Sequence, residues 1–407
     1  MRVVLLNQYY APDEAATAQL LADLGAGLAD AGHSVHAVCS RRSYADPDHV
    51  YPAHETIGGV EVYRTWSTGF GRGRVLGRVL DYVTYLIGAC WILLLRARPD
   101  VVISLSTPPM VAVLGWLAAR VRRAVAVYWV MDVYPDLAFE LGALRPRALS
   151  GRLFAALSRF VLRRSDRVVA LGETMAARLR RGGAARVDVI HNWADGDAIR
   201  PARCADNPLR RQWGWQDRFV VLYSGNMGMA HEFDTVIECA ERLKGDPRVL
   251  FAFVGAGPRR GELEAAVRDR ELPNVELRSY VERDRLGDSL TAADVHLVTL
   301  RDRMPGLLVP SKIYGILAAG RPTIYVGPDE GEIATIVAEG RCGARVALGD
   351  VSALCDCVRR YASGRELCHE QGRRARELFD RRFTKAHGLA AFGRVIRSGI
   401  GEEASSA

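Results

Sequence analysis

The chain has 407 residues, of which 49% are hydrophobic and 25% charged, and its formal net charge is +8. This length is too great for one hydrophobic core, so we expect two domains of about 200 residues each. The eight cysteines form no Cys-x-x-Cys pair and show no metal-like histidine spacing, which excludes a disulfide scaffold and predicts reduced thiols in a cytoplasmic protein. The apolar run at residues 3–6 is too short for a signal-peptide core, so no export is predicted.

The positive charge is carried almost entirely by arginine, because lysine occurs only at positions 244, 312 and 385. Arginine clusters lie at residues 72–78, 120–123, 159–167 and 178–186. Neither interleaved aromatic residues nor a reader motif accompanies this charge, so no nucleic-acid partner is predicted. An anionic inner-membrane surface or a phosphorylated acceptor is the preferred partner, and solvated helix faces are the alternative.

One segment, residues 75–95, is apolar enough to suggest contact with a membrane. Arg78 and Asp81 leave fewer than the roughly 20 consecutive apolar residues that a span requires, so the segment is not expected to cross a bilayer. A helix with basic flanks, Tyr85 and Trp91 is typical of one that lies in the membrane interface. A buried core helix explains the same apolarity. Peripheral contact with the cytoplasmic face of the membrane is our prediction.

The first half of the chain alternates short apolar runs with amphipathic segments. Strands are predicted at residues 3–7, 33–39, 60–65, 101–105, 124–130, 167–171 and 187–190. A helix capped by Asp13, with four leucines between residues 20 and 28 on one face, joins the first two strands. Apolar strands separated by helices predict a parallel sheet covered on both faces, with a binding crevice beyond the strand ends.

The second half repeats this pattern after a predicted linker at residues 197–216. Strands are predicted at residues 219–223, 250–254, 275–277, 295–300, 323–326 and 343–346, followed by helices at 351–379 and 385–396. The fold class is therefore α/β, with two Rossmann-like domains that face each other across a deep cleft. The predicted division is a domain at 1–200, a domain at 201–380, a C-terminal helix at 381–397 and a flexible tail at 398–407.

A glycine-spaced turn follows the first strand of the second domain. The strand at 219–223 runs directly into Ser224-Gly225-Asn226-Met227-Gly228, and an amphipathic helix follows. Backbone N–H groups in such a turn point at an anion, which predicts phosphate binding. An ordinary strand-to-helix turn also uses glycine, so this spacing alone leaves both readings open.

Six segments carry a resemblance to a known family. They are residues 7–21 (NQYYAPDEAATAQLL), 128–136 (YWVMDVYPD), 189–195 (VIHNWAD), 223–235 (YSGNMGMAHEFDT), 253–258 (FVGAGP) and 309–322 (VPSKIYGILAAGRP). In this order they resemble the glycosyltransferases of family 4, which have the GT-B fold. Within that family the chain is similar to bacterial surface-polysaccharide enzymes of the aminofucose-type sugar transferase subgroup, over residues 2–397.

The resemblance implies a retaining transfer of a sugar from a nucleoside diphosphate sugar, with a UDP-sugar favoured. The donor is expected in the second domain, and a polyprenyl-linked or oligosaccharide acceptor in the first. Such enzymes build O-antigen, capsule and related polysaccharides. No metal or other cofactor is expected, because loop N–H groups, a helix N-terminus, Arg and Lys can neutralise a leaving diphosphate.

The donor-binding residues that the resemblance implies lie in the second half. The set is Gly225, Asn226, Met227, Gly228, Glu282, Arg301, Ser311, Lys312 and Glu332. Many family members have Arg and Lys in the first turn, where this chain has Asn226 and His231. Lys312 is therefore expected to supply the missing positive charge, and a solvated surface lysine is the alternative.

A second departure from the family pattern concerns its Glu-x₇-Glu signature, which aligns with Leu307 and Gly315. One carboxylate of that pair usually holds the donor ribose. Glu332 is the replacement that we predict for the ribose, and Glu282 lies where the base is usually bracketed. Either residue can instead be a helix cap or a solvated acid.

Two groups are predicted to act on the reacting sugar. Asp132 directly follows a predicted buried strand, where a carboxylate can orient an acceptor hydroxyl or stabilise oxocarbenium charge. His231, in the donor turn, can hydrogen-bond the diphosphate or the sugar. Further acceptor contacts are predicted from Tyr10, Glu14, Asp136 and His191. The alternatives are turn caps for the aspartates and hinge packing for His191.

Two other functions are compatible with the sequence. A nucleotide-sugar 2-epimerase has the same two-domain architecture, but would be expected to carry many catalytic Asp, Glu and His residues in both domains. A catalytically silent nucleotide-sugar-binding scaffold is suggested by the missing glutamate pair and the missing phosphate-binding Arg and Lys. The scaffold would bind nucleotide without turnover.

Overall fold

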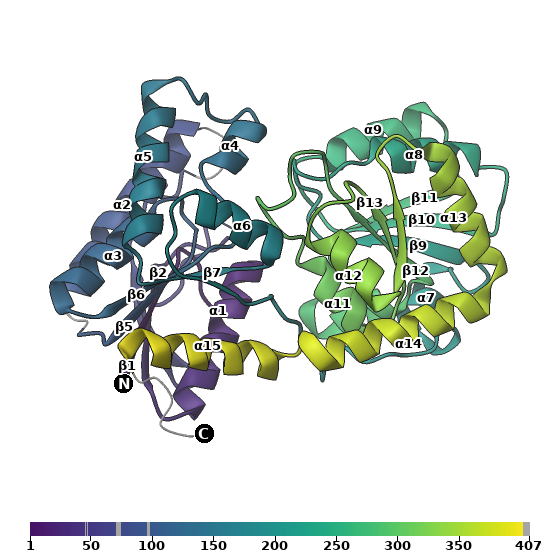
Figure 1. Ribbon diagram of the computed structural model, residues 1–407. Coiled ribbons are helices and arrows are strands. Elements are labelled where there is room, and N and C mark those ends of the chain that lie inside the picture. The colour runs from purple at the N-terminus through teal and green to yellow at the C-terminus, as the bar shows by residue number, and fades with distance from the viewer. Residues whose placement is uncertain (45, 47, 71–74, 96–97, 402–407) are drawn as a thin grey trace. The chain divides into compact units, whose positions relative to one another are not determined.

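The computed structural model describes the chain except for residues 45, 47, 71–74, 96–97 and 402–407 (Figure 1). The predicted tail therefore lies largely outside the described residues, as do Arg72 and Arg74 of the first arginine cluster. The chain divides into two compact units. The first comprises Met1–His191, Gly306–Leu308 and Gly388–Ala407, and the second comprises Asn192–Pro305 and Val309–His387.

The first unit contains an eight-stranded sheet. Its strands are β1 (Arg2–Leu6), β2 (Ser34–Ser40), β3 (His54–Ile57), β4 (Val60–Thr65), β5 (Val101–Ser104), β6 (Val125–Trp129), β7 (Arg167–Ala170) and β8 (Val187–Val189). Their order is β3-β4-β2-β1-β5-β6-β7-β8, and all neighbouring pairs are parallel except β3 and β4. Seven strands confirm the sequence prediction. The edge strand β3 was missed because its four residues include His54 and Glu55, whose polarity gives no clear strand pattern.

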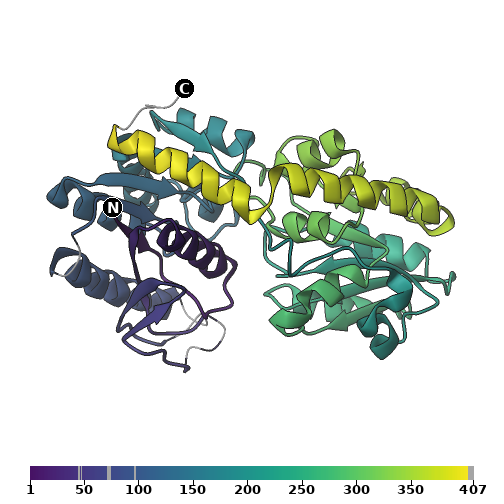
Figure 2. The same ribbon diagram turned by 90° about the horizontal axis from the view of Figure 1, so that it is seen from below.

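Helices cover this sheet on both faces. They are α1 (Ala16–Asp30), α2 (Val75–Leu95), α3 (Val111–Arg122), α4 (Asp136–Glu140), α5 (Leu149–Arg164) and α6 (Glu173–Arg181), with α15 (Lys385–Ile400) returning beside α1 (Figure 2). The predicted Asp13 cap is wrong, because α1 begins after Ala15; the Asp13 carboxylate instead accepts hydrogen bonds from the N–H groups of Ala15 and Tyr44. The helix at 75–95 begins and ends as predicted.

The second unit contains a six-stranded, all-parallel sheet. Its strands are β9 (Phe219–Ser224), β10 (Val249–Val254), β11 (Val275–Arg278), β12 (Val295–Thr299), β13 (Thr323–Val326) and β14 (Gly343–Val346), in the order β11-β10-β9-β12-β13-β14. Its helices are η1 (Cys204–Asp206), α7 (Pro208–Trp213), α8 (Asp234–Arg242), α9 (Arg260–Asp269), η2 (Arg283–Arg285), α10 (Leu286–Thr291), α11 (Lys312–Ala318), α12 (Glu332–Gly340), α13 (Val351–Ser363) and α14 (Arg365–Arg382). All six predicted strands are confirmed.

The strand order creates one switch point in each sheet. In the first unit the chain leaves β1 toward β2 and returns on its other side at β5, and in the second it does the same at β9 and β12. Ligands of open α/β sheets bind beyond the carboxyl ends of the strands at such points. The loops after β1 and β5, and after β9 and β12, are therefore where each unit is built to bind.

The predicted linker at 197–216 is wrong, because this segment folds as part of the second unit. Asn207 caps α7 by accepting a hydrogen bond from the N–H of Arg210. The buried Arg210 guanidinium donates to the backbone carbonyls of Trp215, Arg218 and Ala292, and pairs with Asp294 at 3.0 Å. The polar residues that suggested a linker instead form hydrogen bonds with one another and with the rest of the second unit.

We expect Arg210→Ala to lower the free energy of unfolding of the second unit by about 3–5 kcal/mol. The substitution removes the cation that pairs with Asp294, which keeps the N–H of Val220 as a donor, and removes a donor from the buried or partly buried carbonyls of Trp215, Arg218 and Ala292. Urea unfolding measures the change. Arg200→Ala, which removes an exposed arginine paired with Asp197, is the matched control and should alter stability by no more than about 0.5 kcal/mol. Equal effects of the two variants would contradict the network.

Candidate functional site

The switch point of the second unit is built from two glycine loops that interlock. Gly225, at the end of β9, has φ +125°, a conformation that side chains other than glycine rarely adopt. A Cβ at Gly255, after β10, would overlap the Gly225 carbonyl, and one at Gly257 would lie 2.6 Å from Asn226 Oδ1. The Gly225 and Met227 N–H groups bond the carbonyls of Val254 and Ala256 at 2.9 and 2.7 Å. The loop after β9 is therefore held in one shape by the loop after β10.

Other N–H groups of this loop remain available to a ligand. Among the described residues, the N–H groups of Asn226 and Gly228 donate to no protein acceptor. Met227 is fully buried and packs in the core of the unit. Its side chain therefore anchors the loop to the core and is not a ligand contact. The arrangement fits the predicted anion-binding turn.

Lys312, the first residue of α11, lies at the same switch point. Its Cε and Nζ are 3.5 and 3.6 Å from the position that a Cβ on Gly225 would take, and Nζ lies 3.3 Å from the centre of the Tyr223 ring. Nζ is buried and has no hydrogen-bond partner in the described part of the chain. Burial lowers the pKa of Lys312 well below its ordinary value. The alternative of a solvated surface lysine is wrong.

His231 lies beside this lysine in the loop before α8. Its Nδ1 is 2.6 Å from the carbonyl of Thr299 at the end of β12, and its ring meets the Tyr223 ring edge-on. Burial, with the nearby Lys312 as a second cause, lowers the pKa of His231 to about 3. The ring is therefore neutral at physiological pH, with a proton on Nδ1, and Nε2 is an acceptor.

Arg259, just before α9, was not predicted as part of this site. Its buried guanidinium donates to the His231 carbonyl at 2.7 Å, pairs with Glu262 and lies over the Phe233 ring. Arg301, after β12, donates to the Met229 carbonyl at 3.2 Å. Both arginines brace the loop that carries His231. The sequence signal for Arg259 was its place directly after the Gly-Ala-Gly-Pro turn.

The remaining predicted donor residues are less tightly placed. Ser311 is exposed and precedes α11 without capping it through its side chain. Glu282 is exposed in the turn after β11, and Glu332 begins α12. A Cβ at Gly315 would meet Leu290 Cδ1 at 3.0 Å, so the aligned glutamate of the family pattern would not fit without rearrangement.

The first unit places Asp132 directly after β6. The N–H groups of Met131 and Asp132 donate to Ser106 Oγ at 3.2 and 3.1 Å, and Ser106 lies in the loop after β5. The Asp132 side chain is partly buried, and this desolvation raises its pKa to about 6. A buried carboxyl with a raised pKa at a strand end is a candidate functional group.

The structure does not bring all predicted acceptor residues to Asp132. Tyr10 is buried, with its hydroxyl against α1 at Gly25. Asp136 begins α4 and pairs with Arg178 at 2.9 Å, and His191 bonds the Leu171 carbonyl through Nδ1. Glu14 is exposed in the loop after β1. Burial of Tyr10 favours a packing role, whereas Glu14, Asp136 and His191 keep polar atoms near the surface.

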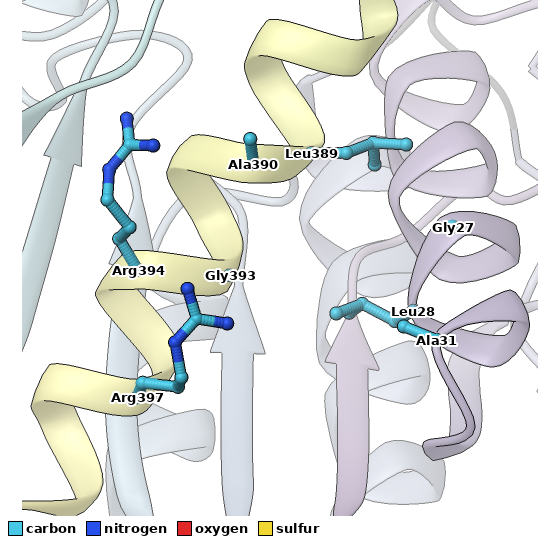
Figure 3. A pocket seen from close by; sticks show the side chains of 8 residues that line it. All are labelled: Gly27, Leu28, Ala31, Leu389, Ala390, Gly393, Arg394 and Arg397. Atoms are coloured by element: carbon cyan, nitrogen blue, oxygen red, sulfur yellow. The ribbon is translucent and has the colours of Figure 1, made fainter. Parts of the chain in front are cut away.

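A groove between α1 and α15 has none of these residues in its wall (Figure 3). Gly27, Leu28, Ala31, Leu389, Ala390 and Gly393 give it an apolar floor, and Arg394 and Arg397 lie along α15. Within the described ranges, no cluster of three His, Cys, Asp or Glu side chains has the arrangement of a metal site. Of the helices described, none combines the length and apolarity that crossing a bilayer requires.

Comparison with known proteins gives the same division of the chain. Residues 16–193 match the glycosyl transferase 4-like domain family, and residues 218–363 match the glycosyl transferases group 1 family. The chain is 28% identical to the probable glycosyltransferase WbjE of Pseudomonas aeruginosa over 262 residues, which span 63% of this chain and 64% of WbjE. It is 26% identical over 335 residues to the putative colanic acid biosynthesis glycosyl transferase WcaI of Escherichia coli K12, covering 79% and 82% of the two chains.

The fold also resembles that of Anabaena HepE, solved in complex with UDP, with a TM-score of 0.72 and 16% identity over 98% of this chain and 100% of HepE. The protein is therefore a glycosyltransferase with the GT-B fold. Its first half is similar to the glycosyl transferase 4-like domain and its second half to the glycosyl transferases group 1.

Replacing the buried lysine tests the site in the second unit. We expect Lys312→Met to weaken binding of a diphosphate ligand by about 1.5–3 kcal/mol, which is the range of a charge-assisted contact. The same variant should unfold at a higher temperature without ligand, because a buried ammonium with no partner destabilises the folded state. Calorimetric titration and thermal unfolding give the two values.

The pH dependence follows from the lowered pKa of Lys312. Between the folded and the ordinary lysine pKa, the folded protein binds fewer protons than the unfolded chain, so stability rises with pH across this window. The advantage of Lys312→Met should therefore shrink as the pH approaches about 10.4. Lys244→Met, at an exposed lysine, is the matched control and should change neither quantity. A loss of stability in Lys312→Met at neutral pH would contradict the unfavourable burial of this lysine.

Proposed function

We propose that the protein transfers a sugar, with retention of anomeric configuration, from a UDP-sugar to a polyprenyl-linked or oligosaccharide acceptor in cell-surface polysaccharide synthesis. The observation that carries the donor part is the buried Nζ of Lys312, which lies beside the Gly225 turn and has no hydrogen-bond partner among the described residues. An unpaired buried cation is costly unless an anion binds there. The aminofucose-type subgroup is our proposal for the kind of sugar.

The donor diphosphate is proposed to bind between Lys312 and the N–H groups of Asn226 and Gly228. The ammonium then gains its missing partner, and the N–H groups gain acceptors. His231 Nε2 is an acceptor and would repel phosphate oxygens, so we assign it to a hydroxyl of the donor sugar. The diphosphate role that the sequence left open for His231 is the less favourable one.

Asp132 is proposed to orient the acceptor hydroxyl through its carboxylate. In the transfer, the acceptor oxygen forms a bond to the anomeric carbon, and the bond from that carbon to the β-phosphate oxygen breaks. The hydroxyl proton passes to the leaving phosphate, which lies on the same face of the sugar, so no protein nucleophile is required. We propose that charge on the leaving diphosphate is balanced by Lys312 and backbone donors without a metal ion.

Known relatives support the substrate classes. HepE is solved with UDP, and the name of WcaI refers to colanic acid biosynthesis. A surface polysaccharide acceptor carried on a polyprenyl lipid fits these similarities, and would place the protein at the cytoplasmic face of the inner membrane. No nucleic acid takes part in this proposal.

A thermal-shift series tests the donor. We expect UDP and UDP-sugars to raise the melting temperature, GDP and dTDP to have smaller effects, and EDTA to make no difference, because binding to the folded state stabilises it by mass action. Lys312→Met serves as the control that should lose the UDP shift. A shift that EDTA abolishes would disprove the metal-free site, and a preference for GDP or dTDP would disprove the choice of base.

The pH profile of transfer tests Asp132. The rate should fall as the pH drops through about 6, because Asp132 becomes protonated, and Asp132→Asn should lower the rate by about 10²–10⁴-fold without weakening UDP binding. His231 does not contribute to this fall in the transfer rate, since its pKa is about 3. The measurement is sugar release from UDP-sugar with acceptor present, at several pH values.

The raised pKa of Asp132 also has a stability consequence. Between about pH 4 and 6 the folded protein holds a proton that the unfolded chain has lost, so this group reduces stability as the pH rises through that window. Asp132→Asn should therefore stabilise the protein at pH 7 while lowering activity. Asp30→Asn, at the exposed end of α1, is the control that should leave rate and stability unchanged. Full activity in Asp132→Asn would exclude the proposed role.

A further inference from the structure

An unusual stripe of large apolar side chains runs along the solvent side of α2. Its members recur every three or four residues and are all exposed: Leu76, Val79, Leu80, Val83, Ile87, Trp91 and Leu95. Ile87 is 66% exposed and Trp91 is 70% exposed. The helix has 21 residues, so the stripe is about 30 Å long. Contiguous apolar surface of this extent marks a contact with a partner or a membrane.

The opposite side of α2 already serves the core. Tyr85, Ala89 and Leu93 are fully buried against Val4 and Leu6 of β1 and their neighbours. Asp81, the acidic residue of this helix, is turned toward the preceding loop, where it bonds Thr68 Oγ1 at 2.7 Å. The exposed stripe is therefore free of carboxylates and is not needed for folding.

Two neighbouring helices extend the surface. Both α2 and α3 pack on one core cluster and so cover the same face of the sheet, and α5 packs on α3 through the Trp116–Phe160 pair (Figure 1). Each adds two exposed apolar side chains: Leu117 and Val121 on α3, and Leu149 and Leu153 on α5. Leu149 is 82% exposed.

The charge on these helices has a single sign. α3 and α5 contain six arginines and neither Asp nor Glu. Five of the six, Arg120, Arg152, Arg159, Arg163 and Arg164, are exposed and have no carboxylate partner among the described residues. The sixth, Arg122, donates to the Leu94 carbonyl near the end of α2. By contrast, Arg167 and Arg178 nearby are paired with Asp188 and Asp136.

We propose that the exposed face of α2, α3 and α5 docks the protein on an anionic lipid bilayer. Apolar side chains on one helix, flanked by unpaired arginines, are the pattern of a helix that lies in the membrane interface. A second copy of this chain is a poorer occupant, because it would bring like charges together. The lipid surface supplies both the apolar environment and the negative charge that this face lacks.

Docking would hold the first unit, which carries Asp132, at the membrane in which a lipid-linked acceptor lies. This extends the proposed function by naming the surface on which a lipid-linked acceptor is met. The docking test needs no nucleotide and no turnover. If the protein binds vesicles but transfers no sugar, only the proposed function is refuted. If the protein transfers sugar but does not bind vesicles, only the docking proposal is refuted.

The experiment is flotation of the full-length protein with vesicles of phosphatidylcholine, or of phosphatidylcholine with phosphatidylglycerol. We expect binding to the anionic vesicles, weakened by salt. Ile87→Gln/Trp91→Gln should weaken binding about tenfold or more by removing apolar contact. Arg159→Glu/Arg163→Glu should weaken binding to anionic vesicles by at least about tenfold.

Matched controls carry the same kinds of change outside this face. Leu286→Gln/Ile400→Gln replaces two exposed apolar side chains, and Arg268→Glu/Arg270→Glu reverses two surface charges of the second unit. Both should bind vesicles like the unchanged protein, and circular dichroism verifies that every variant is folded. Equal binding by all variants, or no binding to either vesicle, would overturn the proposal. Lipid-free dimerisation that Ile87→Gln/Trp91→Gln abolishes would overturn it in favour of a second copy.

Discussion

The site in the second unit depends on one constraint, which is the cost of holding a positive charge on the buried Lys312 amine without an anion beside it. Nζ sits over the face of Tyr223, whose ring offers only weak compensation for lost hydration. Both elements that position the lysine are anchored by buried side chains, those of β9 in the core cluster of the second unit and those of Ile313, Tyr314, Ile316 and Leu317 in α11. An anionic ligand that binds beside Nζ would stabilise the protonated lysine, and this gain adds to the affinity for the ligand.

His231, which lies beside Lys312, is kept neutral by its burial. A second cation next to Lys312 would be unfavourable, and the structure avoids it by burying the imidazole and directing Nδ1 at the Thr299 carbonyl. Asp132 in the first unit is also a group whose charged form is disfavoured when no substrate is present. Asp132 and Lys312 are therefore two side chains, one in each unit, whose charged forms are disfavoured by burial.

The sequence predicted the sheets well because parallel strands buried on both faces are continuous apolar runs, as at 219–223 and 250–254. It also located Lys312 and the Gly225 turn. It failed for β3, whose pattern is polar, and for 197–216, where Arg210 satisfies a buried network that composition alone makes look like a linker. Arg259 and the exact burial of Tyr10 depend on contacts between residues far apart in the sequence. The local sequence pattern does not predict such contacts.

The two sides of the helix at 75–95 have different surroundings. From the sequence its apolarity fitted either a core helix or an interfacial one, and in the structure one side packs on β1 while the other is exposed. The core reading is therefore right for one side of the helix, and membrane contact stays a prediction for the other side. A helix that is apolar all round is normally buried all round. The exposed half of α2 lies on the unit that carries Asp132, so membrane contact and acceptor chemistry can be served by one rigid body whose sheet fixes the position of both.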